Sequence, residues 1–155
     1  MDVKGILKQA LFVFVVLLTT CGTPETALFL PKENSTITLL TDAGPQALRV
    51  EIADQAVQWQ RGLQGRAKLA EDLGMLFVFP DARVRKFWMR DTSIPLDLLF
   101  FNEQREVIAI QHNVPPCKEE PCPTFGPDTS AQYVLEVNSG WAKEHGIKLG
   151  DKIGQ

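Results

Sequence analysis

Residues 87–101 read Phe-Trp-Met-Arg-Asp-Thr-Ser-Ile-Pro-Leu-Asp-Leu-Leu-Phe-Phe, a stretch rich in apolar side chains. Its pattern predicts one strand over residues 87–92 and a second over residues 96–101. Between them, Pro95 cannot donate a backbone hydrogen bond and favours extended geometry at the preceding residue, so this segment is a connection. The second strand is apolar on both faces except at Asp97, which predicts a central strand covered on both sides.

Asp97 is the exceptional residue of this stretch, because an isolated carboxylate among leucines is costly to bury. We expect it to be compensated by accepting backbone N–H groups of residues 92–94, as a cap of the turn. The alternative is a carboxylate that lines a functional pocket, since charges in unusual surroundings mark sites more often than chance.

Glu136 is a second carboxylate in an apolar setting, within a strand predicted over residues 133–138. Arg61, Arg66 and Arg90 are available partners, and a buried arginine–carboxylate pair would be bidentate and rigid. A structural ion pair is the plainer interpretation. The functional alternative is a small polar pocket, for which the candidate residues are Arg66, Trp88, Asp97 and Glu136.

The remaining pattern predicts a mostly β fold: a compact antiparallel β sandwich or barrel with one or two short helices. Helices are expected over residues 55–63, capped by Asp54, and from Ser139 to His145. Pro80 is expected to end the strand that begins at Gly74. Further strands are expected over residues 36–40, 48–53, 74–79 and 107–114.

The first 35 residues predict export and lipid anchoring rather than part of the fold. Residues 1–20 combine two lysines with a short apolar run, as in a secretory signal peptide. This segment ends in Leu18-Thr19-Thr20-Cys21, which resembles a lipoprotein cleavage box with Cys21 as the lipidated residue. An ordinary signal peptide and an uncleaved membrane anchor are the alternatives. We therefore expect a tether over residues 21–35 and a single β domain over residues 36–155, held at the membrane of the cell envelope outside the cytoplasm.

The charge balance argues against a nucleic-acid partner. The chain carries a formal net charge of −3, and without residues 1–20, which hold two lysines and one aspartate, the remainder is −4. Binding to nucleic acid requires clustered lysine and arginine to neutralise phosphates. The expected partners are the membrane, through the lipid, and an unknown small molecule or envelope protein.

Cys117 and Cys122 lie in a proline-rich loop of a chain expected to fold outside the cytoplasm, where disulfide formation is the default. The alternative is a zinc or copper site in which His112, and at greater distance His145, would join the two sulfurs. We expect no metal and no cofactor.

Three segments carry a family resemblance: Gly-Met-Leu-Phe-Val-Phe-Pro at 74–80, Phe-Trp-Met-Arg-Asp-Thr at 87–92 and Ile-Pro-Leu-Asp at 94–97. With them, residues 48–153 resemble the bacterial and archaeal family called domain of unknown function 192. The resemblance implies a compact, mostly β domain with no established activity. It also supports the disulfide, because many members are similar around Cys117 and Cys122.

No motif in the sequence identifies a catalytic activity, and the nucleophile pattern Gly-x-Ser-x-Gly is absent. We therefore expect a binding or accessory module rather than an enzyme. The alternatives are an envelope hydrolase that uses Asp97 and Glu136 as paired carboxylates, and a metal-handling protein. A sugar-binding surface formed by Trp59, Trp88 and Trp141 is less favoured than packing roles for these rings.

Overall fold

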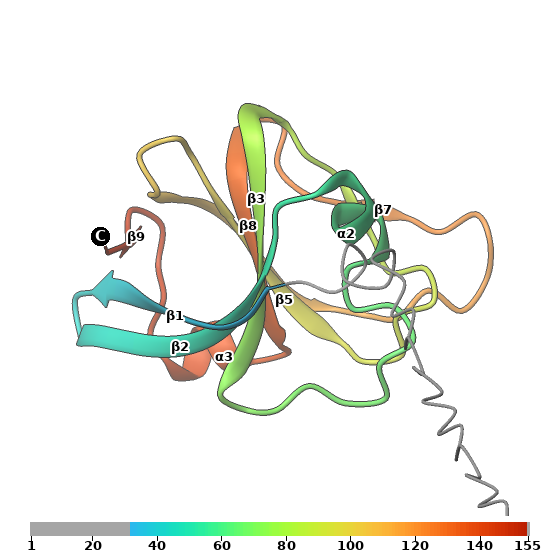
Figure 1. Cartoon of the computed structure of the whole chain (residues 1–155), viewed down its shortest axis with the longest axis horizontal. Coiled ribbons are helices and arrows are strands. Elements are labelled where there is room, and N and C mark those ends of the chain that lie inside the picture. Colours follow the sequence, from blue (N-terminus) through green and yellow to red (C-terminus); the bar gives the residue numbers. More distant parts are fainter. Residues whose placement is uncertain (1–31, 155) are drawn as a thin grey trace, which may run out of the picture.

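The protein is seen in a computed structural model that describes residues 32–154, and its main feature is a curled seven-stranded sheet (Figure 1). The strand order is β6-β5-β8-β3-β2-β1-β9, and β4 and β7 form a separate two-stranded sheet. The strands are β1 (Lys32–Thr41), β2 (Gly44–Ala53), β3 (Leu73–Val84), β4 (Phe87–Trp88), β5 (Leu96–Phe101), β6 (Val107–Val114), β7 (Thr124–Phe125), β8 (Ser130–Asn138) and β9 (Lys152–Ile153). The helices are α2 (Ala56–Arg61) and α3 (Trp141–Glu144).

The mostly β fold is confirmed, with one departure from the expected antiparallel pattern. β2 and β3 pair in parallel, and α2 lies in the connection between them. The other strand pairs of the described residues are antiparallel. A bridge between Glu106 and Lys152 joins β9 to the start of β6, so the two ends of the strand order meet. This contact makes the curled sheet barrel-like rather than a sandwich.

β5 is the buried central strand that its sequence predicts, since all six of its residues are buried between β6 and β8. The strand predicted over residues 87–92 is wrong in length, because β4 has only two residues and lies outside the large sheet. Asp91 has a φ of 53°, which is incompatible with extended backbone and turns the chain toward β5.

Pro80 does not end β3, which continues to Val84. The pairing of β3 with β8 is irregular between Val78 and Arg83, and Pro80 lies within this interruption. A proline without an N–H is tolerated where the ladder of hydrogen bonds is already broken. The strand therefore bends at this point and carries Arg85 and β4 over one face of the sheet.

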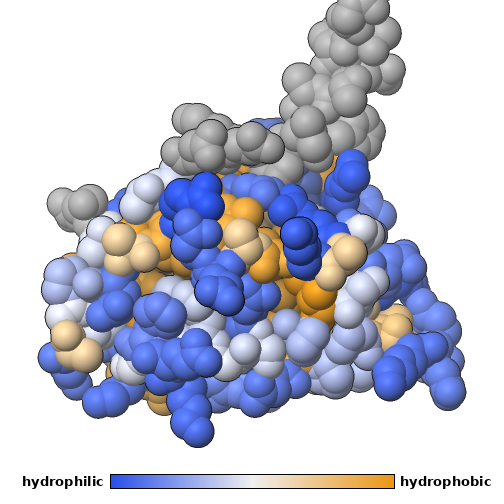
Figure 2. All heavy atoms as spheres, turned by 90° about the horizontal axis from the view of Figure 1, so that it is seen from below, coloured by the Kyte–Doolittle hydropathy of each residue, from blue (hydrophilic) through white to orange (hydrophobic). Residues whose placement is uncertain are grey.

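Apolar side chains form two clusters on opposite faces of the sheet. In β5, Leu99 and Phe101 belong to one cluster, whereas Leu96, Leu98 and Phe100 belong to the other. α3 contributes Trp141 to the first cluster, and Trp59 of α2 packs against the second. On the face seen in Figure 2, apolar atoms reach the surface in a hollow that hydrophilic residues border.

Both helices are shorter than expected, and other residues cap them. The first turn of α2 is closed by Gln58, whose Oε1 accepts the backbone N–H groups of Asp54 and Gln55 at 2.9 and 3.1 Å. α3 begins after Gly140, not at Ser139, whose hydroxyl donates to the side chain of Asn113. Neither Asp54 nor Ser139 is therefore the cap that the sequence suggests.

Candidate functional site

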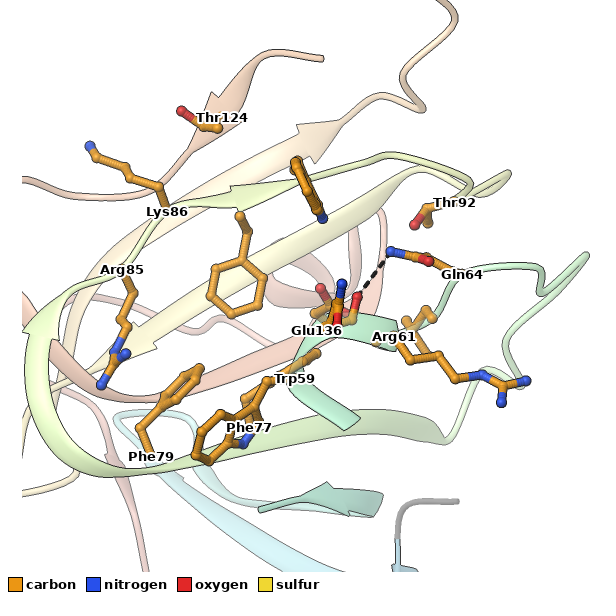
Figure 3. Close-up of a pocket in the computed structure, with 15 residues that line it drawn as sticks. Trp59, Arg61, Gln64, Phe77, Phe79, Arg85, Lys86, Thr92, Thr124 and Glu136 are labelled. Atoms are coloured by element: carbon orange, nitrogen blue, oxygen red, sulfur yellow. Dashed lines mark hydrogen bonds between the residues drawn. The ribbon is translucent and has the colours of Figure 1, made fainter. Parts of the chain in front are cut away.

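A pocket of about 380 Å³ opens between α2, the end of β3 and β4 (Figure 3). Its walls are mainly aromatic, because α2 supplies one ring, β3 supplies two and β4 supplies two. These rings are Trp59, Phe77, Phe79, Phe87 and Trp88. Pockets for small molecules in proteins have this kind of lining and begin at about 300 Å³.

The aromatic walls are held in place by contacts among themselves. The Trp59 ring centroid lies 4.9 Å from that of Phe79, and Phe87 meets Phe77 edge-on at 5.1 Å. Trp59 is fixed further because its Nε1 donates to the carbonyl of Ala53 at 2.9 Å. Trp88 differs from the others in being 41% exposed, so its ring forms part of the mouth of the pocket.

Glu136 places a carboxyl group in this aromatic pocket. It is 5% exposed, and its Oε2 atom has no hydrogen-bond partner among the described residues. Burial raises the pKa of Glu136 to about 8, and the positive charge of Arg66 lowers this pKa only in part. At neutral pH the group therefore carries a proton in most molecules, and it can donate a hydrogen bond.

The ion pair predicted for Glu136 is not the one that forms. Arg66 instead donates two hydrogen bonds to Glu51, at 2.7 and 2.5 Å, and this pair is largely buried. Arg90 is bound to Glu120 at 2.6 Å. Glu51 was not distinguished by the sequence, although it lies between the apolar residues Val50 and Ile52 in β2.

Three basic side chains also line the pocket, and two of them are already paired. Arg85 lies over the ring of Phe79 at 4.0 Å and donates to Asp81 at 2.6 Å, but its Nε has no partner in the described residues. Lys86 donates to Asp128 at 2.8 Å. Arg61, at the end of α2, is exposed.

Asp97 lies away from this pocket, on the other face of the sheet. It pairs directly with Val137 of β8, whereas Glu136 pairs with Leu98, and neighbouring residues of a strand face opposite sides. The prediction that Asp97 accepts hydrogen bonds from the backbone N–H groups of residues 92–94 is wrong. Asp97 is completely buried and accepts the backbone N–H groups of Asn113, Gly140 and Ala142 at 2.9, 3.1 and 3.1 Å. It therefore fixes the start of α3 against β5 and β6.

Of the four pocket candidates chosen from the sequence, Trp88 and Glu136 line the same pocket. Arg66 acts on Glu136 through its charge but does not line the pocket, and Asp97 is elsewhere. The other four aromatic walls were missed as site residues. The sequence could have placed Phe77 and Phe79 together, because residues two apart in a strand lie on the same face of the sheet.

The predicted disulfide between Cys117 and Cys122 is present, with a sulfur–sulfur distance of 2.08 Å. The alternative metal site thus loses both sulfur ligands, and residues 32–154 contain no cluster of three or more acidic, histidine or cysteine side chains suited to a metal. The disulfide loop also reaches the pocket. Its Glu120 holds Arg90, whose guanidinium lies 4.3 Å from the Trp88 ring, and Thr124 of β7 pairs with Trp88.

The predicted signal peptide, the lipidated Cys21 and nearly all of the tether lie outside the described residues. Within residues 32–154, neither helix approaches the length and apolar character that a membrane crossing requires.

Among the solved structures that resemble this chain, two are each 33% identical to it over 79% of its length. A protein of unknown function from Novosphingobium aromaticivorans DSM 12444 has a TM-score of 0.73 and is covered over 85% of its own chain. A candidate transcription regulator from Sinorhizobium meliloti 1021 has a TM-score of 0.72 and is covered over 95%. No curated protein matches the chain. Residues 38–155 match the family described as "Uncharacterized ACR", so the chain belongs to domain of unknown function 192.

Proposed function

We propose that this protein is an envelope-anchored lipoprotein whose aromatic pocket binds a small molecule. The observation that supports binding is Glu136, whose Oε2 is buried in the pocket without a hydrogen-bond partner in the described residues. Leaving a buried polar group unsatisfied costs about 1–3 kcal/mol. A bound molecule that supplies the missing partner would remove this cost and gain affinity from it.

Binding is favoured over hydrolysis because the two carboxylates that a hydrolase would need are not together. Asp97 and Glu136 face opposite sides of the sheet. Among the described residues, the groups that donate hydrogen bonds to Asp97 are three backbone N–H groups, and the His112 Nδ1 atom lies 3.7 Å from its Oδ2. Paired acid and base carboxylates must flank one bond of the substrate. Among the described residues the pocket has a single carboxyl group, that of Glu136, and its walls are mainly aromatic, which suits recognition.

Binding can be tested by the melting temperature of the full chain, purified in a nonionic detergent and screened against a library of small metabolites. We expect at least one compound to raise the melting temperature of the wild type, because a ligand of the native state stabilises it. The rise should disappear in Glu136→Leu and persist in Glu106→Gln, a matched control whose carboxylate pairs with Lys152 outside the pocket. Equal rises in Glu136→Leu, or no rise with any compound, would contradict the proposal.

Lipid anchoring is supported by the cleavage box that ends at Cys21. Intact-mass analysis of the protein from membranes should show a chain that begins at Cys21 and carries two or three acyl groups. Cys21→Ala should either leave the signal peptide attached or release the protein from the membrane. A wild-type product that is soluble and begins at another residue would rule the anchor out.

A further inference from the structure

We infer that the pocket selects small aromatic acids: molecules with one planar ring system and a single anionic group. This inference rests on the proposed function, since it assigns a ligand class to the same pocket. It is carried by three features of the lining: its shape, its charge and its two unpartnered polar atoms.

The shape of the pocket favours a flat ring. Phe77, Phe79 and Phe87 meet one another in stacked and edge-on arrangements, so the walls already present both ring faces and ring edges. Aromatic ligands pack favourably in such an arrangement because ring edges and faces carry opposite partial charge. The volume, about 380 Å³, is near the lower limit for ligand pockets, which favours one small ring system over a peptide or a lipid chain.

The charge of the lining favours an anion over a cation. Arg61, Arg85 and Lys86 line the pocket, and within residues 32–154 Glu136 is the only acidic residue that lines it. Burial raises the pKa of Glu136 to about 8, so this group adds little negative charge at neutral pH. Arg61 is the cation left for an anionic group, because it is exposed while Arg85 and Lys86 are bound to Asp81 and Asp128. In Figure 3 its side chain extends away from the aromatic rings, so it would turn toward the mouth of the pocket when an anion binds. An amine would be repelled by the positive charge of Arg61.

The two buried polar atoms without partners in the described residues, Glu136 Oε2 and Arg85 Nε, belong to residues of this pocket. Glu136 belongs to β8, whereas Arg85 directly follows β3, and Figure 3 shows the two side chains on separate segments. Arg85 Nε is a donor, and a protonated Glu136 is also a donor. Both therefore require acceptor atoms from a ligand, which oxygen substituents of an aromatic acid supply and an ammonium group cannot.

The test compares three molecules with the same ring and different charge: indole-3-acetate, indole-3-ethanol and tryptamine. Each is titrated by calorimetry at pH 7 into the full chain in nonionic detergent. We expect the acid to bind at least about tenfold more tightly than the amine, with the alcohol between them. Arg61→Gln should weaken the binding of the acid by about three- to tenfold and leave the affinity for the alcohol unchanged. Lys143→Gln, which removes an exposed cation on α3, should change neither.

The outcomes separate this inference from the proposal on which it rests. Equal affinity for all three molecules, or tighter binding of tryptamine, would overturn the acid preference while leaving ligand binding by the pocket intact. Acid binding that is insensitive to both Arg61→Gln and Trp88→Ala would lie outside the pocket, and the inference would be wrong. If none of the three binds, the ligand class fails, and the metabolite screen still decides whether the pocket binds anything.

Discussion

Asp97→Ala is expected to lower the free energy of unfolding by about 3–5 kcal/mol, because it leaves three backbone donors, which are buried or part-buried, without an acceptor. The donors are the backbone N–H groups of Asn113, Gly140 and Ala142. They come from two segments that are far apart in sequence, so the carboxylate connects the end of β6 to the start of α3. Loss of this connection should also loosen Trp141 and the cluster beneath it.

The measurement is chemical denaturation of the full chain in detergent, comparing the wild type with Asp97→Ala and Asp97→Asn. Asparagine keeps one oxygen but turns an NH₂ group toward backbone donors. The stability of Asp97→Asn should therefore lie between those of the wild type and Asp97→Ala. Asp72→Ala is the control, since that carboxylate is exposed and its pair with Arg49 is solvated; it should change stability little. An Asp97→Asn protein clearly more stable than the wild type would show that the charge is retained for something other than stability.

Stability should fall as the pH rises from about 5 to 8, because of Glu136. In the unfolded chain this carboxyl loses its proton near its ordinary pKa of 4.5, whereas burial raises the pKa to about 8 in the folded protein. Between these values the folded state binds more protons than the unfolded state, so the free energy of unfolding decreases with pH. At about 1.4 kcal/mol per pKa unit, the total is on the order of 5 kcal/mol, and it levels off above the folded pKa.

Glu136→Gln isolates this effect, because glutamine has a similar shape and does not titrate. The difference in unfolding free energy between wild type and variant, measured at each pH from 5 to 9, should shift progressively in favour of the variant. Carboxylates with lowered pKa values, such as Glu106 and Glu120, lose their protons below this range and are common to both proteins. A difference that does not change with pH would mean that Glu136 is ionised in its pocket.

The sequence predicts this fold well where local patterns decide it. The continuous apolar run of β5, the turn between β1 and β2, and the disulfide loop follow from residue type and spacing. The parallel pairing of β2 and β3 does not, since it depends on how α2 carries the chain across the sheet. The pairing irregularity that accommodates Pro80 is likewise set by β8, more than 40 residues away.

The candidate site shows the same division. Asp97 and Glu136 could be recognised as unusual because each is a carboxylate in an apolar strand. Their surroundings could not be assigned, because the partners of Asp97 are distant in sequence. Of the arginines expected as partners of Glu136, Arg66 is bound to Glu51 and Arg90 to Glu120. The aromatic pocket exists only when α2, β3 and β4 are assembled, so no local pattern in any one of them reveals it.

The loop closed by Cys117 and Cys122 serves the pocket rather than the large sheet. This loop leads directly into β7, whose pairing with β4 supports Trp88 at the mouth of the pocket. Neither cysteine belongs to a strand of the large sheet. Reduction of the disulfide should therefore affect the mouth around Trp88 more than it affects the scaffold.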